Sequence, residues 1–200
     1  MTHYHDKTCV HYKVKQNKVT NAQSRMAAAT EAVKSFIKTY SGRFNENSKE
    51  TTTDNLNLGR WVCLVLFNET GGVLNGGWLD VSNKDAYQKA TDTSKWKAEE
   101  GTNLDCGLKL ADDQLKQDAV KNIGNSLKNV VVLTDGKPTY YLGKVSHSWQ
   151  SDITIGNTYY KVKHNGKSCD ENTFQNTKNS ATDLKQNASV YTVCFGASGE

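Results

Sequence analysis

The stretch Asn129-Val-Val-Val-Leu-Thr-Asp-Gly-Lys-Pro138 contains the clearest strand signal in the chain. Its first half is apolar and β-branched, which is typical of a strand buried on both faces of a sheet. The second half ends the strand, because Gly136 allows a sharp turn and Pro138, the only proline, stiffens the exit. A buried strand with a polar exit predicts an α/β sheet whose chemistry lies at the carboxyl ends of its strands.

The segments around this strand alternate between helical and strand patterns. Helices are expected over residues 26–40, 83–97, 104 to about 122, and about 171–186. Buried strands are expected at Trp61–Phe67 and Ser189–Phe195, with a shorter, less buried strand at Trp78–Val81. This order predicts a Rossmann-like, doubly wound and mostly parallel sheet flanked by helices.

Composition favours one globular domain and excludes several classes of protein. The 200 residues are 36% hydrophobic, which is enough for a core that carries polar insertions at about residues 2–23 and 139–169. No apolar run approaches the roughly 18 residues of a membrane span, so membrane insertion is not expected in this segment. The 25 Lys and Arg residues are scattered against 21 Asp and Glu residues, a pattern that argues against a nucleic-acid partner.

Two polar segments are expected at the carboxyl edge of the sheet, namely Gly101–Leu108 and Thr134–Pro138. The hydroxyl of Thr102 and the carboxylate of Asp135 are hard oxygen donors, which Mg²⁺ accepts together with several waters. Each feature also has a plain structural interpretation. Asp-Gly after a strand commonly forms a turn, and Thr102 could cap the helix that follows it.

Taken together, these motifs resemble the von Willebrand factor A domain family. Gly101-Thr-Asn-Leu-x-x-Gly-Leu108 is similar to the second metal motif of that family, and Val130–Pro138 is similar to the third. Trp61–Phe67 followed by Asn68 is similar to its second strand. The run Ala181–Gly196 is similar to the helix and strand that come after the third motif.

The chain departs from this family at its first metal motif, because Asp-x-Ser-x-Ser occurs nowhere in the sequence. We therefore expect a partial domain over residues 1–200 that lacks the central first strand, with Met1 just after the missing motif and further elements beyond Glu200. Thr102 and Asp135 are the two metal ligands that the resemblance leaves. Binding of Mg²⁺ or another divalent cation should be weak or absent in this chain, although the complete domain would hold it.

The resemblance implies a binding module of a bacterial cell-surface or pilus-type protein, not an enzyme. An acidic side chain of a protein partner would complete the coordination of the divalent cation, and the protein would be extracellular. An alternative is a cytoplasmic assembly factor of the same family that acts beside an ATPase. A hydrolase-like or phosphotransfer enzyme using Asp135 is disfavoured, because no nucleophile with a paired histidine can be identified.

The cysteines and the insertions leave several open interpretations. Cys63 and Cys194 are expected in the core. Cys9, Cys106 and Cys169 are expected at one end of the sheet, where a disulfide between two of them is a hypothesis with Cys9 and Cys169 as the best-placed pair. Asp105 is expected to be a solvated residue of the first helical turn. The aromatic residues of the second insertion are either interface anchors or a small core of their own: Tyr140, Tyr141, Trp149, Tyr159 and Tyr160.

Overall fold

The structure is a computed structural model of the whole chain. It describes residues 25–42, 60–96, 101–118, 120–122, 124, 127–134, 136–164 and 168–194. The helices in these ranges are α1 (Arg25–Tyr40), α2 (Lys84–Thr91), α3 (Leu104–Leu115) and α4 (Glu171–Lys185). The strands are β1 (Trp61–Val62), β2 (Val65–Phe67), β3 (Gly71–Val73), β4 (Leu79–Asp80), β5 (Asn129–Thr134), β6 (Tyr140–Val145), β7 (Ile153–Ile155), β8 (Thr158–His164) and β9 (Ser189–Cys194). Short 3-10 turns lie at η1 (Leu74–Gly76) and η3 (Ser148–Gln150).

The described elements form a mixed α/β structure, as the sequence predicts, but with several small sheets. Strands β1 and β4 pair antiparallel, as do β2 and β3, while β5 and β9 pair parallel. The second insertion forms an antiparallel sheet with the strand order β6-β8-β7. A doubly wound sheet is not confirmed, because β5 and β9 are the one parallel pair within the described ranges.

The expected strand Trp61–Phe67 is divided in two. Its first part, β1, pairs with β4, and its second part, β2, turns back through a tight connection onto β3. Local antiparallel pairing therefore supplies the backbone hydrogen bonds that a central parallel strand would have taken from its neighbours. The expectation that this segment is buried on both faces is wrong, since Trp61 is 44% exposed.

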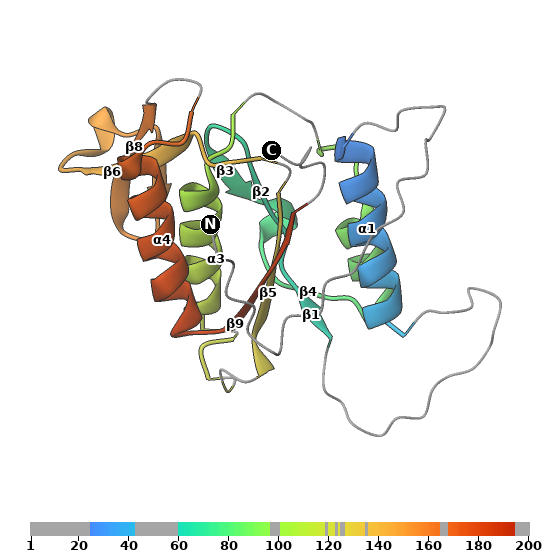
Figure 1. Cartoon of the computed structure of the whole chain (residues 1–200). Helices are drawn as coiled ribbons and strands as arrows, with labels where there is room; N and C mark the ends of the chain where they lie inside the picture. The colour runs from blue at the N-terminus through green and yellow to red at the C-terminus, as the bar shows by residue number, and fades with distance from the viewer. Residues whose placement is uncertain are drawn as a thin grey trace, which may run out of the picture.

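Helix α3 lies at the centre of the structure, with α4 and the β5–β9 pair beside it (Figure 1). Leu108 and Leu115 of α3 pack with Val132 of β5 and Leu184 of α4. Another side of α3 packs on the insertion sheet through a second cluster, which contains Cys106, Leu110, Leu142 and Ile155. A third cluster joins α1 to α2 and β4 around Ile37, Val81 and Ala90.

Helices α3 and α4 cover one face of the β5–β9 pair. Val132 points toward them and is 8% exposed, whereas Val131, Tyr191 and Val193 on the opposite face are 43%, 56% and 48% exposed. The prediction that β9 is a buried strand is therefore wrong for its last four residues, Tyr191 to Cys194, which are all exposed. Alternation of side chains explains the exposure of Val131, Tyr191 and Val193, because a single helical layer covers one face of the pair. Thr192 and Cys194, on the other face, are also exposed, so the helices do not cover the last part of β9.

Helix positions agree with the apolar spacing, and their ends differ. Helix α1 covers the expected range, and α4 ends one residue before the predicted limit. Helix α3 stops at Leu115, seven residues before the predicted end at about 122, and the chain continues in turns that begin with Lys116. Among the described helices, none has the length and apolar character needed to cross a membrane.

Candidate functional site

Three connecting segments meet at the amino-terminal end of α3. They are residues 68–70 after β2, residues 101–103 before α3, and residues 136–139 after β5. Asn103 joins the first two, because its backbone N–H donates to the Asn68 carbonyl at 2.6 Å and its Nδ2 donates to the Glu69 carbonyl at 2.7 Å. The same side chain caps α3 by accepting from the Cys106 N–H at 3.0 Å. Asn103 is fully buried, so these bonds form away from water.

Thr102 joins the third segment to the other two. Its N–H donates to Oγ1 of Thr139 at 3.2 Å, and its carbonyl accepts from the N–H groups of Thr139 at 2.9 Å and Tyr140 at 3.3 Å. The Thr102 Oγ1 atom lies 3.5 Å from the position that a Cβ on Gly136 would take. The structure therefore places one predicted ligand, Thr102, beside the segment that directly follows the other, Asp135. Asp135 itself lies outside the described residues.

The turn after β5 is held by Thr134. Its hydroxyl donates to the Gly136 carbonyl at 3.1 Å and accepts from the Gly136 N–H at 3.4 Å. This double contact is the local hydrogen bonding by which threonine stabilises a turn. These bonds hold Gly136 beside the end of β5, and Gly136 lies close to the start of α3.

The donor chemistry of these loops fits a weak cation site at most. Among the described residues, no group of three or more His, Cys, Asp or Glu side chains could hold a metal ion. The Glu69 carboxylate accepts from the Tyr140 hydroxyl at 2.9 Å. Within the same ranges the Thr102 hydroxyl takes part in no hydrogen bond, which leaves this oxygen open to a ligand. One hydroxyl and one carboxylate would leave most positions of a cation to water, as Mg²⁺ tolerates.

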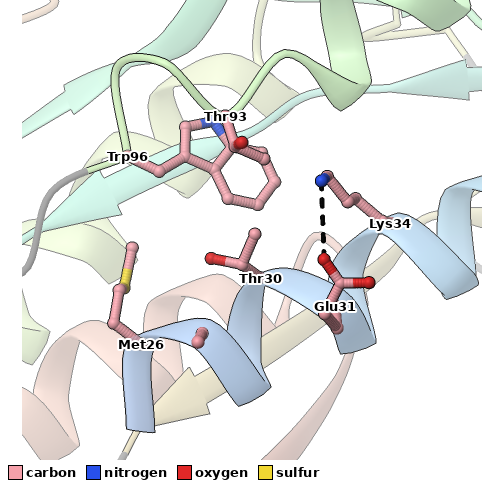
Figure 2. A pocket seen from close by; sticks show the side chains of 7 residues that line it. Met26, Thr30, Glu31, Lys34, Thr93 and Trp96 are labelled. Atoms are coloured by element: carbon pink, nitrogen blue, oxygen red, sulfur yellow. Dashed lines mark hydrogen bonds and ion pairs between the residues drawn. The ribbon is translucent and has the colours of Figure 1, made fainter. Parts of the chain in front are cut away.

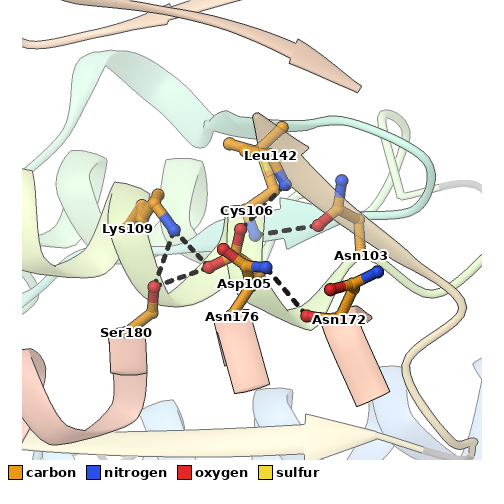
Figure 3. Close-up of polar contacts among 8 residues, drawn as sticks. All are labelled: Asn103, Asp105, Cys106, Lys109, Leu142, Asn172, Asn176 and Ser180. Atoms are coloured by element: carbon orange, nitrogen blue, oxygen red, sulfur yellow. Dashed lines mark hydrogen bonds and ion pairs between the residues drawn. The ribbon is translucent and has the colours of Figure 1, made fainter. Parts of the chain in front are cut away.

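Asp105 has a larger structural role than the sequence indicates. We expect a solvated carboxylate from its place in the first turn of α3, and this is wrong, because the side chain is fully buried. It accepts hydrogen bonds from the Leu142 N–H of β6 at 2.8 Å and from the Ser180 hydroxyl of α4 at 2.5 Å (Figure 3). Lys109, one turn further along α3, forms an ion pair with it.

The Asp105 cluster connects three elements that are distant in sequence. The Lys109 ammonium also donates to the Ser180 hydroxyl at 2.7 Å, so the carboxylate, the ammonium and the hydroxyl contact one another (Figure 3). The sequence gives one local signal, the i, i+4 spacing of Asp105 and Lys109, which is typical of an ion pair on a helix. It gives no signal for the bonds to Leu142 and Ser180, because these residues arrive from segments 37 and 75 positions away.

The cysteines differ in part from expectation. Cys106 is fully buried inside α3, and Cys63 is half-buried in the short link between β1 and β2. Cys169 is a free thiol, and Cys9, with which the sequence pairs it, lies outside the described residues. Burial raises the pKa of the Cys63 thiol to about 11. Burial, aided by the Asp105 charge, raises the pKa of Cys106 to about 12.

A separate depression of about 450 Å³ lies between α1 and the segment after α2 (Figure 2). Met26, Thr30 and Trp96 contribute to its walls, and the Glu31 carboxylate pairs with the Lys34 ammonium at 3.5 Å. This depression and the loops around Thr102 share no lining residue. We therefore do not count it as part of the candidate site.

Comparisons with known proteins found no match to a protein family, to a curated protein or to a solved structure. The resemblance drawn from the metal motifs therefore stays a prediction. Function is therefore inferred from the geometry of the three loops and from the chemistry of their side chains.

Gly101 provides a test of how these loops fit together. Its φ of +91° is in the region that disfavours L side chains, and an added Cβ would lie 2.7 Å from the Tyr140 ring and 2.8 Å from Cγ of Glu69. We expect Gly101→Ala to lower the free energy of unfolding by about 2 kcal/mol, through backbone strain and the displaced side chains. Urea denaturation measures this change.

The matched control for this prediction is Gly72→Ala. Gly72 has an ordinary φ and no atom within 4 Å of an added Cβ. The control should therefore leave the free energy of unfolding nearly unchanged. Equal stability of the two variants would show that Gly101 is not needed where the loops meet.

Proposed function

We propose that this chain is a protein-binding module in which a divalent cation joins the loops around Thr102 to an acidic side chain of a partner. Thr102 supplies a hydroxyl, Asp135 supplies a carboxylate, and water completes most of the remaining coordination. The module acts by binding and not by catalysis, and we propose a place for it at the cell surface.

The proximity of Thr102 to Gly136 is the observation that carries this proposal. The Thr102 hydroxyl oxygen would lie 3.5 Å from a Cβ added at Gly136, and the Thr102 carbonyl accepts from the Thr139 N–H at 2.9 Å, so the start of α3 lies beside the residues that follow Asp135 in the chain. The partial positive charge at the amino terminus of the twelve-residue helix α3 favours an incoming carboxylate and disfavours the cation itself, which agrees with weak cation binding. The two ligands that the family resemblance implies thus belong to segments that touch in space.

Binding of Mn²⁺ tests the site directly, because the electron paramagnetic resonance signal of the free ion reports how much ion is bound. We expect a dissociation constant of about 1 mM, typical of sites with few charged ligands. Asp135→Asn should weaken binding about tenfold, since it removes the charged ligand. Thr102→Val, which keeps the shape of the side chain, should weaken binding by a smaller factor.

Two matched variants control for general effects of these changes. Thr154→Val replaces an exposed threonine of β7, and Asp118→Asn replaces a carboxylate that is 92% exposed after α3. Both should bind Mn²⁺ as the parent chain does. The metal site is excluded if the parent chain binds no Mn²⁺ at millimolar concentration, or if Asp118→Asn weakens binding as much as Asp135→Asn.

A further inference from the structure

The insertion sheet β6-β8-β7 has two faces of different chemistry. Its inner face packs on α3 through Leu142 and Ile155, which are 3% and 8% exposed. Side chains alternate along a strand, so the residues between these inner positions point to the opposite side. We define the outer face by five such residues: Tyr141, Val145, Tyr159, Lys161 and Lys163.

The pairing register places these side chains beside one another. Tyr141 pairs with Lys163, and Val145 pairs with Tyr159, so each end of the outer face carries a tyrosine. Gly143 pairs with Lys161 at the centre. The Lys163 side chain lies across Gly143, because an added Cβ would be 2.9 Å from its Cε and 3.1 Å from its Cγ. The centre of the outer face is therefore covered by an aliphatic lysine stem and not by a bulky side chain.

The outer face carries positive charge that its own residues do not neutralise. Lys161 and Lys163 are both exposed, and neither forms an ion pair with another described residue. None of the five residues that define the face is acidic, and the neighbouring Asp152 carboxylate, which accepts from the Val162 N–H at 2.8 Å between the two lysines, forms an ion pair with neither of them. The two lysines are two positions apart on one strand, so their Cα atoms are separated by roughly 7 Å. Carboxylates at every second residue of an extended peptide repeat at the same spacing.

From these observations we propose that the outer face binds an extended acidic segment of the partner protein. Its alternate carboxylates pair with Lys161 and Lys163, and its remaining side chains pack on Tyr141 and Tyr159. This inference rests on the proposed function for the nature of the ligand, which is a protein. Two lysines on a surface with two tyrosines match a short acidic peptide better than the regular phosphate backbone of a nucleic acid, which requires more positive contacts.

The outer face is also continuous with the candidate cation site. Strand β6 begins at Tyr140, whose N–H donates to the Thr102 carbonyl, and Tyr141 is the next residue along the chain. A segment that lies on the outer face would therefore pass close to the Thr102 loop at one end. The partner that we infer presents several acidic residues in extended conformation, with one near the cation and the others on the lysines.

Fluorescence anisotropy of a labelled peptide with aspartate at every second position tests this inference. The measurement is made at low salt in EDTA, so that no cation contributes. We expect the double variant Lys161→Gln/Lys163→Gln to bind about fivefold more weakly than the parent, since each exposed pair contributes modestly. The control Lys178→Gln/Lys185→Gln removes the same charge from exposed positions of α4 and should change affinity less than about twofold.

Three results would overturn the inference. The first is absence of peptide binding by the parent chain, and the second is an equal loss of affinity in both double variants. The third is tighter binding of a single-stranded oligonucleotide that depends on the same two lysines. Peptide binding in EDTA together with failure to bind Mn²⁺ would retain the outer face and reject the cation site. Binding of Mn²⁺ together with absence of peptide binding in EDTA would retain the cation site and reject the outer face.

Discussion

Replacement of Asp105 by alanine is expected to lower the free energy of unfolding by about 3 kcal/mol, a large part of the stability of an ordinary domain. The carboxylate is fully buried and accepts from the Leu142 N–H and the Ser180 hydroxyl. Its removal leaves these donors without their acceptor. Lys109 is 22% exposed, so its ammonium can turn to water, which limits the loss. Chemical denaturation measures the change.

A second measurement separates the Asp105 cluster from a general loss of packing. Hydrogen exchange at the Leu142 amide should become faster in Asp105→Asn. The asparagine amide places an N–H donor among the Leu142 N–H and the Ser180 hydroxyl, which are themselves donors, and this weakens the hydrogen bond of Leu142. The control is Asp118→Ala, which breaks an ion pair with Lys121 at a side chain that is 92% exposed. Surface pairs of this kind contribute little, so the control should unfold as the parent chain does. Unchanged stability of Asp105→Ala would contradict the role that we assign to the cluster.

The half-buried Cys63 and the buried Cys106 are expected to react with iodoacetamide far more slowly in the folded chain than in the unfolded chain. Only the thiolate reacts, and its fraction at about pH 8 falls tenfold for each unit by which the pKa rises. From the pKa of about 11 for Cys63 and about 12 for Cys106, against 9.0 for an ordinary thiol, we expect rates about a hundredfold and a thousandfold lower. Peptide mass spectrometry after timed labelling measures each rate.

The same pKa values give a direction for stability at high pH. An unfolded chain releases these thiol protons near pH 9, whereas the folded chain holds them until pH about 11 or 12. The folded state therefore binds more protons in this window, and the free energy of unfolding falls as pH rises above 9.

Iodoacetamide labelling in urea serves as the control for the labelling rates, because all cysteines should then react alike. Rapid labelling of Cys106 in the folded chain would contradict its burial.

Elements that depend on local sequence were predicted well. Apolar spacing predicts α1 and the start of α3, and the β-branched run at residues 129–133 predicts β5, because periodic burial leaves its pattern in the residue types. Sheet organisation was not predicted, since pairing depends on partners that are distant in sequence. The run Trp61–Phe67 has the composition of one buried strand, and yet it forms two short strands that pair with nearby residues.

The candidate site was predictable only in part for the same reason. Thr102 was found from its place before an apolar helix, and its contact with the Gly136 segment follows from the fold. Asp105 was misjudged because the residue type and the helix position both suggested solvent. Its burial depends on Ser180 and on strand β6, which reach it from other parts of the chain.

The insertion sheet begins and ends at one point of the molecule. Tyr140 at the start of β6 is paired with His164 at the end of β8, and their rings are 4.5 Å apart. The chain therefore leaves and rejoins the rest of the structure through neighbouring residues, whatever the length of the segment between them. Such a module can be lengthened or shortened while β5 and α4 keep their separation, so the surrounding scaffold places no limit on its length.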